Sequence, residues 1–176
     1  FMGDSFVEGD IVTCDLREEL QSRFGGRGAG FIPADIPFAT VRKSIKRTSS
    51  NWKTYSVMKP KEAPEALRER LFVSGYLAEG RAGATTRWQA TTSHASLDSC
   101  TRARILLISR VEVVLGDTLR NEFMIAGDER IREIYVEGPV DDIRLRVVEG
   151  SVMCYGATME GNGGVTVDNF SVRSNN

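Results

Sequence analysis

Residues 1–30 read FMGDSFVEGDIVTCDLREELQSRFGGRGAG, and the expected fold is organised around this stretch. Phe1-Met2 is typical of the end of an apolar strand, and Gly3-Asp4 then turns the chain so that Ser5 follows the strand directly. A helix is predicted from about Asp10, because apolar residues recur there every four positions. These residues are Val12, Leu16, Leu20 and Phe24. A serine between a strand end and a helix start occupies the place where open α/β sheets bind ligands.

Both ends of the predicted helix carry residues that suit helix termini. The Asp10 carboxylate is expected to accept a hydrogen bond from the free amides of the first turn. Gly25-Gly26 is expected to end the helix in the left-handed conformation that other residues resist. Glu8 and Asp10 are interpreted as acids that complement the positive end of the helix dipole, in preference to a catalytic carboxylate pair.

Composition excludes several classes of protein. The 176 residues carry a net charge of −1, with 27% charged side chains, and this balance argues against a basic nucleic-acid-binding face. No window approaches the run of about 20 apolar residues that spans a membrane. The three cysteines, Cys14, Cys100 and Cys154, show no CxxC spacing. We interpret them as three separate thiols, with a disulfide or a metal site as the alternative, and predict no cofactor.

The pattern changes after residues 32–38, where Pro33 and Pro37 indicate a linker. Short segments of period two follow, separated by Gly, Asp and Pro, and residues 143–147 alternate strictly between apolar and charged side chains. The predicted strands are residues 52–58, 72–77, 83–91, 105–115, 119–125, 131–136, 143–147, 152–159 and 165–172. Many short strands at regular intervals predict a mainly β protein with an antiparallel β-sandwich of jelly-roll type.

Gly3-Asp4-Ser5 resembles block I of the SGNH (GDSL-type) hydrolases, a family of esterases in which this serine is the nucleophile. Residues 26–31 (GRGAGF) and 164–173 (GVTVDNFSVR) resemble a bacterial branch of the family. In that branch a sandwich similar to a carbohydrate-binding module interrupts the hydrolase domain after its first helix. The resemblance covers the two ends of the chain well and its middle only loosely.

This resemblance implies a division of the chain into three parts. Residues 1–35 would be the first strand–helix unit of a flavodoxin-like α/β hydrolase domain, and residues 165–176 would return to that domain. Residues 36–164 would form the inserted sandwich. The hydrolase domain would then be incomplete in this chain, and we expect residues 1–35 to contact residues 165–176.

The resemblance also implies site residues. Ser5 would be the nucleophile and would supply one oxyanion-hole amide, while Ser174 takes the block II position where the family usually has glycine. No block III Gly-x-Asn is present. The only histidine, His94, follows Thr91 instead of the aspartate of the family's Asp-x-x-His, so it is not expected to be the catalytic base. Because acyl transfer by serine needs such a base, we expect the chain alone to be inactive.

The predicted sandwich contains aromatic residues that could stack against sugar rings. We name Trp88, Trp52 and Tyr55 as candidates, with Tyr76 and Tyr155 as further members of the set. The alternative, which we favour for most of them, is that they belong to the core. The basic residues at positions 42, 43, 46 and 47 are interpreted as a solvated face in preference to a site for an anionic polymer.

Two functions therefore remain open from the sequence. In the first, the chain is part of an extracytoplasmic SGNH esterase that removes acetyl or other acyl groups from a polysaccharide, without a cofactor or metal. In the second, it is a noncatalytic carbohydrate- or protein-binding sandwich, and its Gly-Asp-Ser is incidental.

Overall fold

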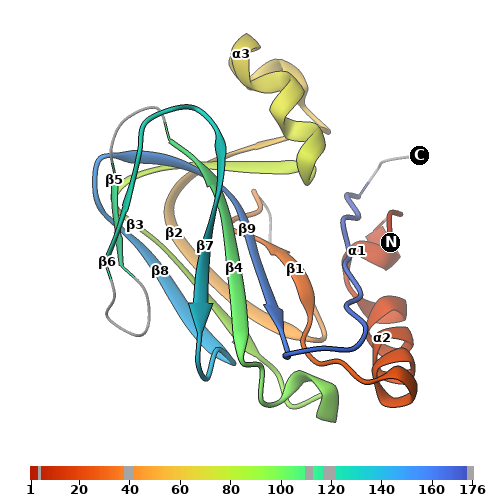
Figure 1. The fold of residues 1–176 in the computed structure, drawn as a ribbon. Coiled ribbons are helices and arrows are strands. Elements are labelled where there is room, and N and C mark those ends of the chain that lie inside the picture. Colours follow the sequence, from red (N-terminus) through yellow and green to blue (C-terminus); the bar gives the residue numbers. More distant parts are fainter. Residues whose placement is uncertain (4, 38–41, 110–112, 117–121, 174–176) are drawn as a thin grey trace.

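The computed structural model describes residues 1–3, 5–37, 42–109, 113–116 and 122–173. Strands are its predominant regular structure, and two helices lie together on one side of the strands (Figure 1). The helical elements are α1 (Ser5–Glu8), α2 (Ile11–Phe24), η1 (Pro60–Glu62), α3 (Glu65–Arg68), η2 (Glu69–Val73) and η3 (Ala95–Leu97). The strands are β1 (Gly30–Pro33), β2 (Ile45–Ser56), β3 (Tyr76–Ala90), β4 (Arg102–Ile108), β5 (Val113–Gly116), β6 (Glu122–Ile125), β7 (Ile131–Glu137), β8 (Asp142–Glu149) and β9 (Ser151–Glu160).

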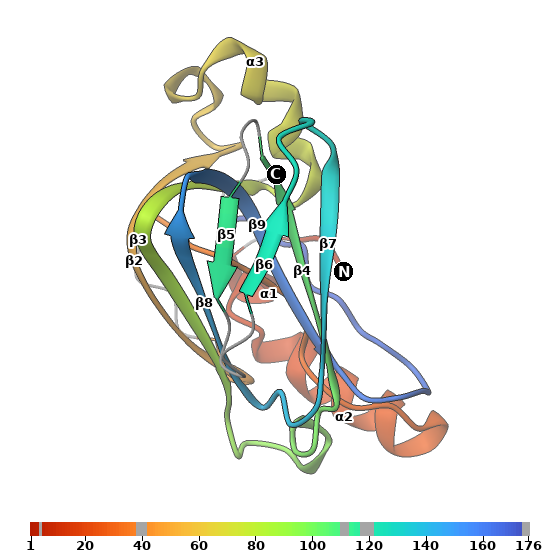
Figure 2. The same cartoon turned by 60° about the vertical axis from the view of Figure 1, so that its left-hand side comes forward.

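All the strand pairs are antiparallel. The main path of the sheet runs β6-β5-β8-β3-β9-β4-β7, with β1 paired to β9 and β2 paired to β3. The sheet is open, and the mainly β, antiparallel class predicted from the sequence is confirmed. Figure 2 shows the strands from a second direction, with α1 and α2 behind them.

The long strand β3 turns the sheet back on itself. Its first half pairs with β9 through Ala78 and Cys154, and its second half pairs with β8 through Trp88 and Ile143. The two halves of the sheet therefore share β3, and their inward side chains meet in one hydrophobic cluster. This arrangement is the physical basis of the sandwich, because each half buries the apolar face of the other.

Trp88 lies at the centre of this cluster. Its side chain is fully buried, and its indole N–H donates a hydrogen bond to the carbonyl of Pro33 at 3.2 Å. Two positions earlier on the same face, the Thr86 hydroxyl donates to the carbonyl of Ala34. The inward face of β3 thus holds the segment that follows β1 as well as the facing half of the sheet.

Several local predictions agree with the structure and others are wrong. The helix expected from Asp10 to Gly25 is α2, and Gly25 has the predicted positive φ, 73°. Residues 165–172 form no strand, although they run extended beside α1 and α2 (Figure 1). Residues 72–73 belong to the 3-10 helix η2, so β3 begins only at Tyr76. No helix among the described residues is both long and apolar enough to cross a membrane.

The burial of Trp88 leads to a direct prediction. Trp88→Ala should lower the free energy of unfolding by about 3–5 kcal/mol, because a large aromatic side chain is removed from a close-packed core. Trp52→Ala is the matched control. Trp52 is only half-buried, so its replacement should lower the free energy of unfolding by less than Trp88→Ala does. Urea denaturation of both variants measures the difference, and an equally small loss in each would contradict the packing described here.

Candidate active site

Ser5 is the first residue of α1, and its side chain is exposed. The short helix α1 ends at Glu8, where Gly9 donates its backbone N–H to the Ser5 carbonyl at 3.1 Å and the chain turns into α2. The hydroxyl of Ser5 is therefore accessible, as a nucleophile must be. Among the hydrogen bonds of the described residues, none joins Ser5 to a histidine or a carboxylate.

Glu8, one turn after Ser5, anchors α1 to the rest of the molecule. Its carboxylate is fully buried and accepts a hydrogen bond from the Tyr76 hydroxyl at 2.6 Å and another from Arg173 Nε at 2.8 Å. Burial, together with the hydrogen bond and charge of Glu8, raises the pKa of Tyr76, which stays neutral. Glu8 is thus a buried link to β3 and the C-terminal segment, and its carboxylate binds Tyr76 and Arg173 instead of the first turn of α2.

Asp10 and Arg17 form a buried ion pair beneath the turn between α1 and α2. Both side chains are 1% exposed, and two nitrogens of the guanidinium donate to the two oxygens of the carboxylate at 3.0 and 3.2 Å. Thr13 and Ser44 donate to the same carboxylate. The third guanidinium nitrogen, Nε, donates a hydrogen bond to the Val167 carbonyl at 3.1 Å.

This pair corrects the capping role predicted for Asp10. Asp10 does occupy the N-cap position of α2, but its carboxylate binds Arg17, Ser44 and Thr13 and makes no capping bond to the first-turn amides. Burial by itself raises the pKa of Asp10. The hydrogen bonds and charge of Arg17, with the hydrogen bonds of Ser44 and Thr13, more than offset this effect, so the pKa lies below its usual range.

The C-terminal segment meets α1 and α2 through Asn169, a buried residue that the sequence analysis did not single out. Its side-chain amide donates to the Val7 carbonyl and to the Thr13 hydroxyl, and its side-chain oxygen accepts from the Ser171 amide. Its own carbonyl accepts from Arg42. The only local signal for this role was the polar pair Asp168-Asn169 within an otherwise apolar run.

Arg42 is also buried, and so it is not part of a solvated basic face. Its guanidinium donates to the carbonyls of Phe31 and Asn169, at 3.1 and 3.3 Å. Removal from water lowers the pKa of Arg42 to about 10, a value at which the group is still protonated at neutral pH. The side chain therefore helps to hold β1 beside the C-terminal segment, a contact that the stacked rings of Phe31 and Phe170 reinforce.

The two ends of the chain lie side by side, as predicted, and their backbone contact differs from the rest of the sheet. The Phe1 amino group donates to the Asp168 carbonyl at 2.8 Å, and the Phe170 amide donates to the Phe1 carbonyl at 2.9 Å. Phe1 therefore hydrogen-bonds the two chain neighbours of Asn169, Asp168 and Phe170. Backbone hydrogen bonds in this arrangement are those of a parallel strand pair. The strand predicted at Phe1-Met2 does not form, but a single parallel bridge does.

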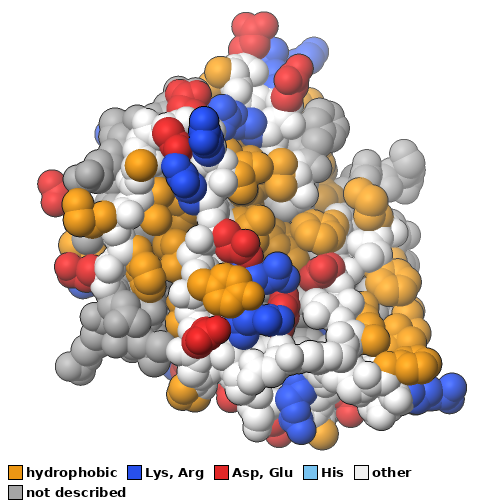
Figure 3. Space-filling model, viewed as in Figure 1, with side chains coloured by type: hydrophobic (Ala, Val, Ile, Leu, Met, Phe, Trp, Pro, Cys, Tyr) orange, Lys and Arg blue, Asp and Glu red, His pale blue; other side chains and the backbone are white. Residues whose placement is uncertain are grey.

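The buried face of α2 is mainly polar, so the predicted orientation of the helix is wrong. Its exposed side mixes apolar side chains with charged ones such as Asp15, Glu19 and Arg23. Among its buried residues are Thr13, Arg17 and Gln21, whereas Val12 and Phe24 of the predicted apolar stripe are 59% and 65% exposed. Figure 3 shows hydrophobic side chains gathered at the right-hand edge, over α1 and α2. The exposed large apolar side chains of this unit are Phe1, Met2, Ile11, Val12 and Phe24.

The remaining predicted site residues do not gather around Ser5. Ser174 lies outside the described residues. His94 hydrogen-bonds Asp15 on α2 at 2.9 Å. Trp88 and Tyr55 are buried, so neither offers a ring face to a sugar, and Trp52 is half-buried with its indole N–H bonded to the Thr85 carbonyl. The sugar-stacking prediction is therefore wrong for Trp88 and Tyr55, which belong to the core.

We expect the packing of α1 and α2 against the C-terminal segment to depend on the Asp10–Arg17 pair. Arg17→Leu should lower the free energy of unfolding by about 3–5 kcal/mol, because it leaves a buried carboxylate without its charge partner. Arg23→Leu, on the exposed side of the same helix, removes only a surface pair with Glu19 and should change stability by less than about 1 kcal/mol. Chemical denaturation at neutral pH compares the two variants, and equal losses would show that the pair is not structural.

The lowered pKa of Asp10 predicts a dependence of stability on pH. The ionised Asp10 carboxylate contributes to the free energy of unfolding. This contribution is fully present above the ordinary carboxyl pKa of about 3.9, and it is lost as the pH falls through the lower pKa of the folded state. Other paired carboxylates lose stability in the same range, so the measurement is the difference between wild type and Asp10→Asn. This difference in unfolding free energy should shrink as the solution is acidified, and a difference that stays constant would contradict the assignment.

Comparison with known proteins gives a similarity of fold. No protein-family model matches the sequence, and no curated protein matches it. A solved structure described as "Peptidoglycan O-acetylesterase in action, 5 min" superposes with a TM-score of 0.68 at 16% sequence identity. The match covers 98% of this chain and 45% of the esterase chain. At this identity the comparison shows a shared fold, and the chain spans less than half the length of the esterase that it resembles.

Proposed function

We propose that this chain is part of a serine ester hydrolase of the SGNH type that removes acetyl or similar acyl groups from a polysaccharide, with peptidoglycan as the first candidate. The observation that carries the proposal is the structural similarity of nearly the whole chain to part of a peptidoglycan O-acetylesterase. The exposed Ser5, in the Gly-Asp-Ser at the start of α1, supports it. Such a substrate lies outside the cytoplasm, and we propose that the protein works there.

The reaction would use Ser5 as the attacking group. Its Oγ would form a bond to the acyl carbonyl carbon while its proton passes to a base, and the carbonyl oxygen would become an oxyanion. Collapse of this intermediate would break the bond to the sugar oxygen, which leaves with a proton. Water would then hydrolyse the acyl-serine to free acid and restore the hydroxyl. The backbone amide of Ser5 is the oxyanion donor that the family resemblance implies.

The catalytic base is not supplied by the described residues around Ser5. His94 is the only histidine of the chain, and its imidazole bonds Asp15 near the loop before η3. The proposal therefore requires that the histidine and its aspartate come from polypeptide outside these residues. A serine without a base is a weak nucleophile, so the chain by itself should hydrolyse esters no faster than its Ser5→Ala variant.

Two structural features support a larger α/β domain around Ser5. The bridge between Phe1 and the segment around Asn169 is parallel, whereas every strand pair of the sandwich is antiparallel. Parallel sheets are covered by helices on both faces, which makes α2 a candidate for one covering helix. Its exposed apolar side chains, Ile11, Val12 and Phe24, would pack against other parts of such a sheet.

The alternative of a sugar-binding module loses its main support in the structure. Its evidence was a set of aromatic residues, of which Tyr55, Tyr76, Trp88 and Tyr155 are buried. Trp52 is half-buried and covers the backbone at Gly80, where an added Cβ would lie 2.5 Å from its ring. These contacts favour a packing role for the rings, so we favour esterase activity over a sugar-binding module, while nothing in these contacts bears on a protein-binding module.

The proposal is tested with the product of the whole reading frame that contains this chain. It should hydrolyse a small chromogenic acetate ester and release acetate from O-acetylated peptidoglycan. Ser5→Ala should lower kcat by about 10³-fold or more, as loss of a catalytic nucleophile does, while the melting temperature changes little because the side chain is exposed.

Ser22→Ala is the matched control, because Ser22 is an exposed serine on α2. It should leave both kcat and the melting temperature unchanged. Full activity of Ser5→Ala would overturn the nucleophile assignment, and absence of ester hydrolysis in the wild-type product would overturn the proposed function.

A further inference from the structure

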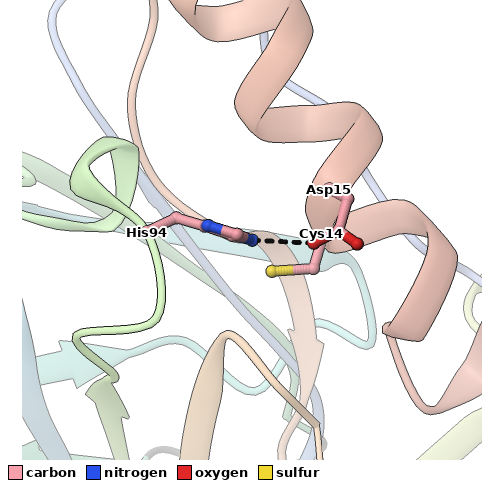
Figure 4. A group of neighbouring side chains, drawn as sticks. All are labelled: Cys14, Asp15 and His94. Carbon is pink, nitrogen blue, oxygen red and sulfur yellow. Dashed lines mark hydrogen bonds and ion pairs between the residues drawn. The ribbon is translucent and has the colours of Figure 1, made fainter.

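Three side chains of types that bind metal ions converge where α2 meets the loop before η3 (Figure 4). Cys14 and Asp15 lie near the start of α2, and His94 directly precedes η3. The Cys14 sulfur, a carboxylate oxygen of Asp15 and an imidazole nitrogen of His94 all lie within 4.8 Å of one another. We propose that this cluster is a binding site for a zinc ion, independent of the role of Ser5.

The donor set suits zinc. Thiolate, imidazole and carboxylate are its usual protein ligands, at about 2.3 Å for sulfur and about 2.0–2.2 Å for nitrogen and oxygen. Bonds of this length at tetrahedral angles place ligand atoms roughly 3.3–3.7 Å apart. The side chains would therefore have to close by at most about 1.5 Å. Asp15 is exposed and His94 lies on a loop, so both can adjust, and a water molecule would take the fourth position.

The cluster already stabilises a positive charge. Lys43 Nζ lies 2.6 Å from Oδ1 of Asp15, and His94 Nε2 lies 2.9 Å from the same oxygen. A zinc ion would take the place of these two hydrogen bonds. Lys43 is 43% exposed on a long, flexible side chain, so it can withdraw into solvent when the ion binds.

The other two cysteines provide the contrast. Cys100 and Cys154 are as buried as Cys14, but their thiols hydrogen-bond the carbonyls of Leu97 and Leu106. The single histidine of the chain thus lies beside one particular thiol of three. The sequence predicted three separate thiols, with a disulfide or a metal site as the alternative, and the placement of His94 distinguishes Cys14 from the other two.

The proposed ion would act as a structural cross-link. It would join α2 to a loop that lies 79 residues further along the chain, counted from Asp15 to His94. Closing so long a loop removes more freedom from the unfolded chain than closing a short one. Because the ligands come together only in the folded state, zinc binding would stabilise the contact between the α1–α2 unit and the sandwich.

The test is titration of the reduced, metal-free chain with Co²⁺, which reports its ligands by absorption, and with Zn²⁺. One equivalent of Co²⁺ should produce the visible bands of a tetrahedral site together with a thiolate-to-metal charge-transfer band, and Zn²⁺ should displace it. Zn²⁺ should also raise the melting temperature. The absence of a thiolate band, or of any change on adding Zn²⁺, would overturn the proposal.

Variants locate the site. Cys14→Ala should abolish the thiolate band. His94→Gln should weaken zinc binding at least about 10-fold, because mutating a residue that merely hydrogen-bonds a metal ligand commonly lowers the affinity by that factor. Lys43→Met should tighten binding by about 2- to 5-fold, because it removes a competing cation. Cys154→Ala and Glu19→Gln are the controls and should bind as wild type. A band that persists in Cys14→Ala or vanishes in Cys154→Ala would assign the metal to another site.

Discussion

The packing of α1 and α2 against the C-terminal segment depends on one buried ion pair, between Asp10 and Arg17. An isolated charge in a protein interior is destabilising by several kcal/mol, so such a pair persists only where hydrogen bonds satisfy the remaining donors and acceptors. Here Ser44 and Thr13 donate further hydrogen bonds to the carboxylate, and the Val167 carbonyl accepts one from Nε of the guanidinium. The pair therefore joins the turn after α1, helix α2, the start of β2 and the C-terminal segment.

The orientation of α2 follows from this pair. Because Arg17 must face the Asp10 carboxylate, the stripe of the helix that contains Thr13 and Gln21 is turned inward, where Gln21 donates to the carbonyls of Gly28 and Val165. Val12 and Phe24, the two ends of the predicted apolar stripe, are consequently exposed, while Leu16 and Leu20 are half-buried. An apolar helix face in solvent is unfavourable, and an exposed patch of this kind commonly marks an interaction surface. This exposure is consistent with the larger α/β domain proposed above.

The same helix faces the sandwich on another side. Cys14 and Asp15 approach the loop of His94, and Ser96 in η3 donates both its amide and its hydroxyl to Glu18. α2 is thus held to the C-terminal segment by its buried polar stripe and to the sandwich by this second set of contacts. The position of Ser5 is set by both, through the short turn that connects α1 to α2.

The sequence by itself determined the classes of the elements and many of their positions. Period-two alternation at residues 143–147 and the glycines after Phe24 act through local backbone geometry, which a sequence pattern reports directly. The Gly-Asp-Ser likewise pointed to Ser5 without any tertiary information, and the contact between the two ends followed from resemblance. Only the tertiary structure decided which side of α2 is buried, because a buried arginine depends on a carboxylate seven residues away and a carbonyl 150 residues away. For the same reason it alone decided that Trp88 is core and that His94 lies beside Cys14: the identity of a neighbour from a distant segment is not encoded in local spacing.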